Sequence, residues 1–154
     1  MKENLFNSTF EVELRILCLL SAGRQLQMSV DRIVSMDFIV CYAECFQLSY
    51  QNLHGDNDYM YGELSNRKSL TEEAIKSLVV QGLVDVKIDA GYLYSISETG
   101  RKYIKKLKSE YATQYKEIAV AAVKTFKKYS DYELAFTIQE IALKTVKGGI
   151  YCFL

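Results

Sequence analysis

Residues 69–107 read SLTEEAIKSLVVQGLVDVKIDAGYLYSISETGRKYIKKL, and this stretch decides the fold. Ser69 or Thr71 suits the N-cap of a helix, and two glutamates in the first turn favour its N-terminal end. Gly82 suits a left-handed C-cap. The apolar positions that recur at helical spacing are Ala74, Ile75, Leu78 and Val79. The pattern predicts an amphipathic helix that ends at Gly82.

The residues after that helix predict a β-hairpin followed by another helix. Residues 83–88 and 92–97 alternate apolar and polar side chains, and the Asp-Ala-Gly turn at 89–91 separates them. Ser97 and Glu98 then open a long helix that we expect to run over 98–126. Helix, turn, two-stranded ribbon and helix is the order of a winged helix-turn-helix. We therefore expect a mainly α fold with a small β-hairpin, in the α+β class.

Further helices are expected on either side of this block. Residues 8–22, opened by a capping-box pattern, and residues 30–46, which follow a good N-cap serine, predict two early helices. Residues 47–68 show little periodicity, and a last helix is expected over 131–146. Residues 1–126 then form a winged-helix domain with its long helix. Residues 127–154 add a C-terminal helix and the apolar tail KGGIYCFL to the same compact unit, the tail being either a hinged docking segment or a packed end.

Composition places the chain among ordinary globular proteins. It has 154 residues, 49% of them apolar and 25% charged, which suits one domain with a sizeable core. No apolar run of about 18 residues indicates a membrane span, and the acidic N-terminus lacks a secretory pattern. We expect a cytoplasmic protein without a membrane partner.

Charge is distributed unevenly along the chain although the net charge is zero. Residues 1–99 hold 8 basic and 14 acidic residues, for a net charge of −6, and residues 100–154 hold 11 and 5, for +6. Such asymmetry concerns partners rather than fold. It favours either head-to-tail self-association or two different faces for two different molecules.

Residues that usually carry chemistry are few, and their spacing favours no known site. Cys18, Cys41, Cys45 and Cys152 form no Cys-x-x-Cys pair, and they are read as small core residues. Cys41, Cys45 and His54 lack a fourth ligand at zinc spacing. No nucleophile elbow or phosphate-binding glycine loop is present. We expect no catalytic residues, no cofactor and no metal.

Nucleic-acid binding is an alternative function that the distribution of charged residues supports only weakly. The expected recognition helix begins with two glutamates, which would face phosphates of the same sign. The run RKYIKKLK at 101–108 presents Arg101, Lys105 and Lys108 at helical spacing for a weak, non-specific contact. The alternative is a solvated helix face, with Tyr103, Ile104 and Leu107 turned inward.

Three stretches carry a resemblance to a known family. VDRIVSMDFIVCYAECFQLSYQNLHGDN, RKSLTEEAIKSLVVQGLVDV and GYLYSISETGRKYIKKLKSEYATQY together resemble the middle component of ABC-three-component systems, the Lamassu-type antiphage defence operons. The resemblance covers residues 8–125. It implies a small non-enzymatic subunit between an SMC/Rad50-like ATPase that senses DNA and an effector, often a nuclease.

The segment 51–58, QNLHGDND, is interpreted as a structured surface loop within that family pattern. Its Asn and Asp side chains are expected to bond their own backbone, with a glycine supplying an unusual dihedral angle. The loop either contacts no partner or presents its side chains to one. The residues for partner contact are Asn52, His54, Gly55, Asp56 and Asn57. The competing function is a dimeric winged-helix transcription regulator, with its dimer helix within 98–126.

Overall fold

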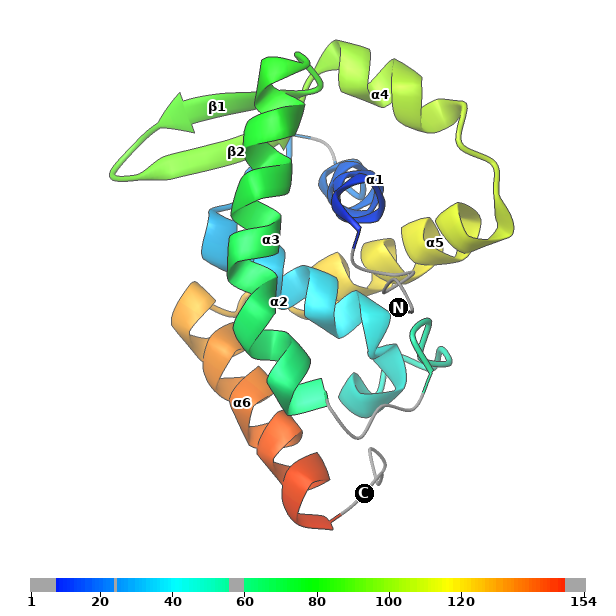
Figure 1. Cartoon of the computed structure of the whole chain (residues 1–154), viewed down its shortest axis with the longest axis vertical. Coiled ribbons are helices and arrows are strands. Elements are labelled where there is room, and N and C mark those ends of the chain that lie inside the picture. Colours follow the sequence, from blue (N-terminus) through cyan, green and yellow to red (C-terminus); the bar gives the residue numbers. More distant parts are fainter. Residues whose placement is uncertain (1–7, 24, 56–59, 149–154) are drawn as a thin grey trace.

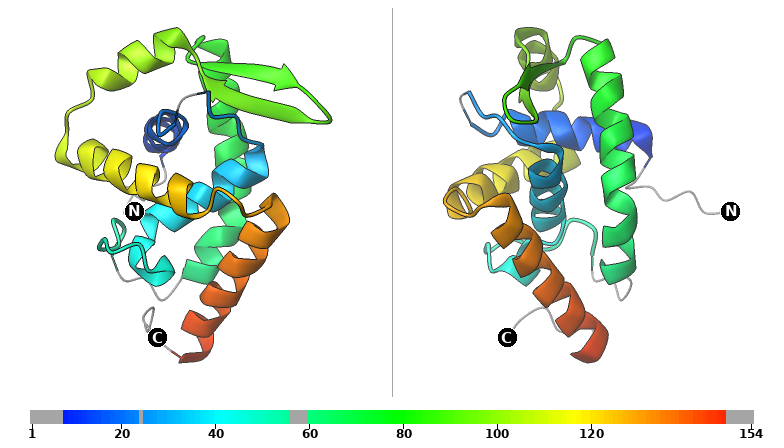
Figure 2. Two further views of the ribbon diagram at one scale, coloured as in Figure 1. Left: turned by 180° about the vertical axis from the view of Figure 1, so that it is seen from behind. Right: turned by 90° about the vertical axis from the view of Figure 1, so that its left-hand side faces the viewer.

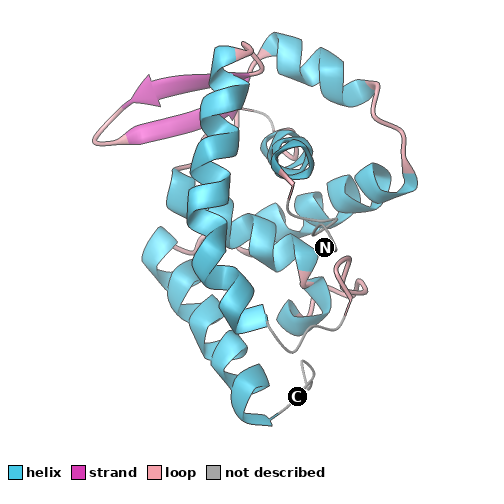
Figure 3. Cartoon of the chain, in the orientation of Figure 1, coloured by secondary structure: helices cyan, strands magenta, loops and turns pink. Residues whose placement is uncertain are grey.

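The computed structural model describes residues 8–23, 25–55 and 60–148. That part of the chain is mainly helical with one small two-stranded antiparallel sheet, as the sequence predicts (Figure 3). The elements in order are α1 (Thr9–Leu20), α2 (Val30–Cys41), the 3-10 helix η1 (Ala43–Phe46), α3 (Met60–Val80), β1 (Val84–Ile88), β2 (Tyr92–Ile96), α4 (Glu98–Lys105), α5 (Glu110–Thr125) and α6 (Asp131–Gly148).

Helix α1 lies at the centre of the upper half of the molecule. Figure 1 looks almost along its axis and shows α3, α4 and α5 around it. Ile16, Leu19 and Leu20 of α1 are fully buried, because this helix contacts α2, α3, α4 and α5. Below it, α2 packs against α3, α5 and α6, and α6 lies along the lower half of α3 (Figures 1 and 2). A single core therefore runs through all these elements.

The hairpin projects from the upper end of α3 (Figure 1). Its register pairs Val84 with Ile96 at the base and Ile88 with Tyr92 near the turn. On the other side of β2, Met28 exchanges two backbone hydrogen bonds with Tyr94, of 2.9 and 2.8 Å. The segment before α2 therefore adds a one-residue bridge to the hairpin. The turn at 89–91 and the positive φ of Gly82 (74°) were both predicted correctly.

The prediction of one long helix over 98–126 is wrong. The structure has α4, then a four-residue link, then α5, which starts anew because the Ser109 side chain accepts a hydrogen bond from the Ala112 backbone N–H. The Lys116 ammonium donates to the carbonyls of Ile104 and Leu107, at 2.8 and 2.9 Å. These bonds give the Leu107 carbonyl, just beyond α4, a donor, and add another to the Ile104 carbonyl, which also accepts from the Leu107 backbone N–H at 3.2 Å. The chain therefore folds back, and α5 runs along α1 and α2.

The predicted start of α3 is wrong as well. The helix begins at Met60, well before Ser69 and Thr71, and Thr71 is buried inside it rather than capping it. Glu63 and Arg67 form an i,i+4 ion pair of 2.7 Å in the first half. Because Arg67 also reaches Asp37 of α2, tertiary contacts hold a segment whose sequence shows little helical periodicity.

Other boundaries agree closely with the sequence. Ser8, Ser29 and Ser97 cap α1, α2 and α4 with their side chains, as expected. Helix α2 ends at Cys41, earlier than expected, and the next residues form η1. The last helix spans 131–148, close to the predicted 131–146. Within the described ranges no helix is long and apolar enough to cross a membrane. The end of the tail KGGIYCFL, residues 149–154, lies outside the described residues.

Candidate functional site

The most unusual feature of the interior is a cluster of charged and phenolic side chains, which we call the Asp37 cluster. Arg15, Asp37 and Arg67 have side chains only 2–3% exposed. Ions are almost never buried to this degree unless they are paired and hydrogen-bonded. The members of the cluster are Arg15 of α1, Asp37 and Tyr42 at and after α2, His54 of the loop, Glu63 and Arg67 of α3, and Tyr111 and Tyr115 of α5.

Asp37 is the centre of this cluster. Its Oδ1 accepts hydrogen bonds from Arg15 Nε at 3.0 Å and from the Tyr115 hydroxyl at 2.7 Å. Its Oδ2 accepts from Arg15 Nη2 at 3.3 Å and from Arg67 Nη1. Burial by itself would raise the pKa of this carboxyl, but Arg15 and Arg67 overcome that effect and lower the pKa to about 2. Asp37 is therefore ionised at every physiological pH and joins α1, α2, α3 and α5.

Glu63 is the second anion of the cluster and pairs with Arg67 through a guanidinium nitrogen that does not contact Asp37. It accepts from Arg67 Nη2 at 2.7 Å and from the Tyr42 hydroxyl, and its Oε1 lies 3.8 Å from His54 Nδ1. Burial opposes ionisation, but the neighbouring His54 ring and the charge of Arg67 hold the pKa of Glu63 well below its usual range. The Arg67 guanidinium also lies over the Phe38 ring, 5.2 Å from its centre. Every cation here therefore has an anion in contact.

His54 closes the cluster on the loop side. Its Nε2 lies 3.0 Å from the Tyr111 hydroxyl, and the two rings stack with centroids 6.4 Å apart. Burial would lower the pKa of the imidazole, but the Cys41 sulfur and the Glu63 carboxylate favour the imidazolium and raise the pKa to about 9. At neutral pH His54 is therefore a cation paired with Glu63. The contacts of the His54 ring with Glu63 and Tyr111 hold the loop against α3 and α5.

The sequence analysis missed this cluster, although it contains a signal that could have found it. Arg15 interrupts the apolar run of α1, and Asp37 interrupts SMDFIV in α2. A single charge at a core position of an amphipathic helix indicates a buried partner of opposite sign. Arg67 gave no such signal, because the residues around it are polar.

The loop around His54 differs from the expected exposed loop. The imidazole is 3% exposed and faces the protein interior, although the loop was expected to lie at the surface, either without a partner or presenting its side chains to one. Asn52 Oδ1 accepts from the backbone N–H of Glu44, at 3.0 Å, rather than from a neighbouring backbone group. Gly55 has the predicted positive φ, 70°. Asp56 and Asn57 lie outside the described residues, so partner contact through this loop stays a prediction.

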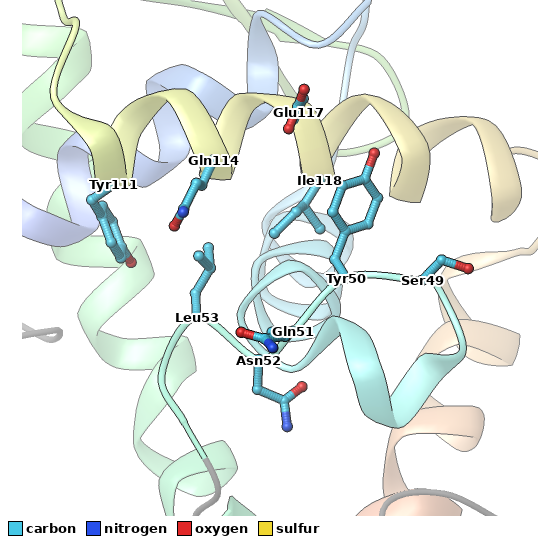
Figure 4. Close-up of a pocket in the computed structure, with 9 residues that line it drawn as sticks. All are labelled: Ser49, Tyr50, Gln51, Asn52, Leu53, Tyr111, Gln114, Glu117 and Ile118. Atoms are coloured by element: carbon cyan, nitrogen blue, oxygen red, sulfur yellow. The ribbon is translucent and has the colours of Figure 1, made fainter.

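A cleft of about 390 Å³ separates this loop from α5 (Figure 4). In Figure 4, Gln114 and Ile118 of α5 face Leu53 and Tyr50 of the loop. A second cleft, of about 320 Å³, lies between α1 and α5, and Tyr111 borders both. Tyr111, which contacts His54, is therefore shared by the two clefts.

The expected nucleic-acid contacts fall on and just beyond α4. Arg101 is partly exposed, and Lys105 and Lys108 are exposed. Helix α4 ends at Lys105, so Lys108 does not continue the helical face on which the prediction placed it. Of the side chains expected to point inward, Ile104 is buried but Tyr103 is 37% exposed. Weak contact with nucleic acid through these residues stays a prediction.

The surface formed by the hairpin and the exposed side of α3 is apolar and acidic. Val84, Val86 and Ile88 of β1 share one face of the hairpin, and their partners on β2 are aromatic or aliphatic. That face is buried at its base but opens toward the turn. Its exposed residues are Val86 (45%), Ile88 (78%) and Tyr92 (61%), and Val80 at the end of α3 is 88% exposed. Glu72 and Glu73 are exposed on α3. We call these six residues the hairpin surface.

The cysteines that the structure describes are all buried. Cys18 and Cys41 are free and buried, and burial raises the pKa of the Cys18 thiol to about 12. Cys45 is buried as well, and Cys152 lies outside the described residues. Among the side chains that the structure describes, no group of three or more His, Cys, Asp or Glu residues is arranged to hold a metal ion.

Comparison with known proteins identifies the family. Neither a curated protein nor a solved structure matches the chain significantly. A family model does match, that of the ABC-three component (ABC-3C) system Middle Component 2, over residues 5–147. This match covers all the described helices except the last residue of α6, both strands of the hairpin and the whole Asp37 cluster. Members of this family are accessory components that assemble with the other components of an ABC-3C defence system, and they are not a known catalytic family. The chain therefore belongs to the middle component 2 family of ABC-three component systems.

Proposed function

We propose that this chain is a non-enzymatic subunit that bridges an SMC/Rad50-like ATPase and an effector, often a nuclease, in a Lamassu-type antiphage defence complex. It does so through protein–protein contacts, and it meets DNA only weakly or indirectly. Family membership supports the assembly with other system components. The bridging role rests on the character of the surface.

The hairpin surface is the observation that carries this proposal. We propose that α2, α3 and the hairpin form a winged helix, and the Met28–Tyr94 bridge supports that reading because it adds a strand segment beside the wing. In such a fold the exposed face of α3 and the hairpin would meet DNA. Here that region offers two glutamates and four exposed apolar side chains, and its exposed cations include Lys76 of α3 and Lys87 of β1. Exposed apolar side chains of this kind mark a protein-contact surface, whereas DNA affinity requires cations.

Co-expression with the neighbouring components tests the proposal. The tagged chain is expected to recover both the ATPase and the effector, and the ATPase is expected to recover the effector only when this chain is present. Ile88→Glu places a charge on the most exposed apolar residue of the hairpin, and it should reduce recovery of one partner at least tenfold. Val120→Glu is the matched control, because Val120 is 52% exposed on α5, away from the hairpin.

Direct ATPase–effector association without this chain would refute the bridging role. Unchanged recovery with Ile88→Glu would refute the assignment of the hairpin surface. Salt-sensitive, sequence-preferring DNA binding by the isolated chain, with no partner recovered, would instead establish a transcription regulator. Fluorescence anisotropy with a labelled duplex, at two salt concentrations, separates that outcome from the weak contact that Arg101, Lys105 and Lys108 are proposed to make.

A further inference from the structure

Helix α6 carries two apolar stripes, and only one of them belongs to the core. Leu134, Ile138 and Ala142 are fully buried against α2 and α3. On the opposite side of the helix, Tyr132 is 78% exposed, Phe136 51% and Leu143 42%. The Tyr132 and Phe136 rings stack on each other at the surface, with centroids 6.4 Å apart. We call Tyr132, Phe136, Gln139 and Leu143 the outer stripe.

The outer stripe has the spacing of a helix–helix contact. Its members follow each other at intervals of four, three and four residues, which is the repeat of a coiled-coil seam. Gln139, in the middle, is exposed as well. A solvent-facing helix normally places polar residues at all of these positions. The stripe therefore fits a second helix laid along α6.

The charges beside the stripe identify which helix fits. Glu133, Glu140 and Lys144 lie along one flank of it, by the 100° rotation per residue of an α-helix. Glu133 and Lys144 are about 16 Å apart along the helix, too far to pair with each other. Neither side chain has an ion pair within the described part of the chain. The flank is thus acidic toward the N-terminal end of α6 and basic toward its C-terminal end.

We propose that the outer stripe pairs with the outer stripe of a second copy of this chain, with the two α6 helices antiparallel about a two-fold axis. A two-fold axis brings the same flank of both helices together, so Glu133 of each copy meets Lys144 of the other. The helix dipoles are also opposed, which is favourable. The flank is complementary to itself only in this antiparallel arrangement.

The same alignment also packs the apolar side chains. When Glu133 stands opposite Lys144 of the partner copy, Leu143 of each copy falls midway between Tyr132 and Phe136 of the other. Gln139 meets its own symmetry mate at the axis, where two amides can hydrogen-bond. Charge pairing and knob-into-hole packing therefore select one register. The Glu140 side chains come near each other beside the axis, which weakens the pair.

A groove on the other flank enlarges the contact. It has a volume of about 420 Å³ and is lined by Tyr132, Ala135 and Gln139 of α6 together with Val34 of α2 and Leu64 of α3. Stable interfaces bury roughly 800 Å² on each partner, and a single stripe beside a groove is at the low end of that range. We therefore expect a dimer with a dissociation constant of about 10 μM.

Sedimentation velocity on the full chain tests the proposal, from about 1 μM to about 200 μM to bracket the expected constant. The mass should rise from 17.7 kDa toward twice that value. Phe136→Asp should raise the dissociation constant more than about tenfold. Val120→Asp, at a residue of equal exposure on α5, should leave it unchanged. Circular dichroism at each concentration confirms that the variants fold.

A charge exchange tests the register. Glu133→Lys and Lys144→Glu should each weaken the dimer by about two- to fivefold, and the two together should restore it, because each new lysine then meets a new glutamate. Glu140→Gln should strengthen it. A chain that stays monomeric at about 200 μM overturns the proposal. So does a dimer that Phe136→Asp leaves intact, or a double exchange that fails to restore association. Partner recovery from the bridging experiment is a separate readout, so either proposal can fail alone.

Discussion

Asp37→Asn is the substitution that most directly probes the interior of this protein. It keeps the shape of the side chain and removes its charge. Asp37 now accepts hydrogen bonds from two nitrogens of Arg15, one of Arg67 and the hydroxyl of Tyr115. An asparagine can accept through one atom only, and its amide N–H groups would face donors. The substitution therefore leaves Arg15 buried without a counter-charge.

The expected loss of stability follows from the burial of the pair. Removing one partner of a buried ion pair costs about 3–5 kcal/mol, mainly because the remaining charge is left uncompensated. Asp37 and Arg15 are both about 2% exposed, so solvent screening reduces this cost little. The pKa of Asp37, lowered from 3.8 to about 2 by Arg15 and Arg67 against the effect of burial, likewise favours the ionised form by roughly 2–3 kcal/mol. We expect Asp37→Asn to lower the free energy of unfolding by about 4 kcal/mol.

Urea unfolding at pH 7, followed by circular dichroism, measures this change. Arg15→Met with Asp37→Leu is the informative comparison, because it removes both charges while Glu63 still neutralises Arg67 at 2.7 Å. That double variant should be more stable than Asp37→Asn alone. Asp31→Asn is the surface control, since its ion pair with Lys68 is 66% and 59% exposed, and it should change stability by less than about 0.5 kcal/mol. A cost below about 1 kcal/mol for Asp37→Asn would refute the assignment of Asp37 as the centre of a buried cluster.

Three further predictions concern other parts of the structure. The pKa of His54 is raised from 6.5 to about 9. The stabilising contribution of the charged ring is therefore complete below pH 6.5 and is lost as the pH rises through 9. The difference in free energy of unfolding between wild type and His54→Gln should shrink by about 3 kcal/mol from pH 6 to pH 10. Gly100→Ala should cost about 2–4 kcal/mol, because the added Cβ would lie 2.3 Å from the Leu83 carbonyl oxygen. Lys116→Met should cost about 1–2 kcal/mol and speed amide hydrogen exchange in residues 106–109, because the Leu107 carbonyl loses its ammonium donor, while the Ile104 carbonyl keeps the Leu107 backbone N–H.

Each of these predictions has a control within the chain. A difference between wild type and His54→Gln that stays constant with pH would show that the Glu63 pairing is not formed. Gly62→Ala is the control for Gly100, because nothing lies within 4 Å of its added Cβ, and it should stabilise α3 slightly. Lys124→Met removes an exposed charge from the same helix as Lys116, and equal effects of the two would refute the specific role of Lys116.

The hairpin and the capped helix starts could be predicted because short-range patterns determine them. Serine caps act within three residues, and the turn at 89–91 needs only the strands on either side of it. The first half of α3 could not be predicted in this way. Glu63 and Arg67 are satisfied by His54, Tyr42 and Asp37, which come from other elements. A polar segment with such partners looks like a loop in the sequence.

The break between α4 and α5 was missed for a related reason. Residues 98–126 contain no proline, and their only glycine, at 100, is inside α4, so a single helix is the simplest reading. The break depends on Ser109, a good cap that also occurs inside helices, and on Lys116, whose ammonium reaches back to the end of α4. Packing of α5 against α1 and α2 then decides between the two outcomes. Intrinsic helix propensity is too weak to oppose it.

The direction of the His54 side chain could not be predicted from the sequence. An isolated histidine followed by glycine and aspartates resembles a site, but its ring contacts Glu63 and Tyr111 inside the protein. These contacts hold the loop in place, while contact between the loop and a partner stays a prediction. Side-chain direction decides this difference, and direction depends on residues nine and 57 positions away along the chain.

Helix α3 connects the features that a bridging subunit would use. Its 21 residues span about 30 Å, with the hairpin at one end and α6 along the other half (Figures 1 and 2). Arg67, in its first half, is fixed to Asp37, and that carboxylate is fixed in turn to α1 and α5. The two apolar surfaces therefore belong to one rigid body and are separated by most of its length.

A molecule bound at the hairpin leaves α6 free for a second copy, so one dimer would carry two hairpins at a fixed distance from each other. Binding two copies of a partner at a set spacing is a geometric task, and a buried ion cluster that joins four helices suits it better than an adaptable apolar core would.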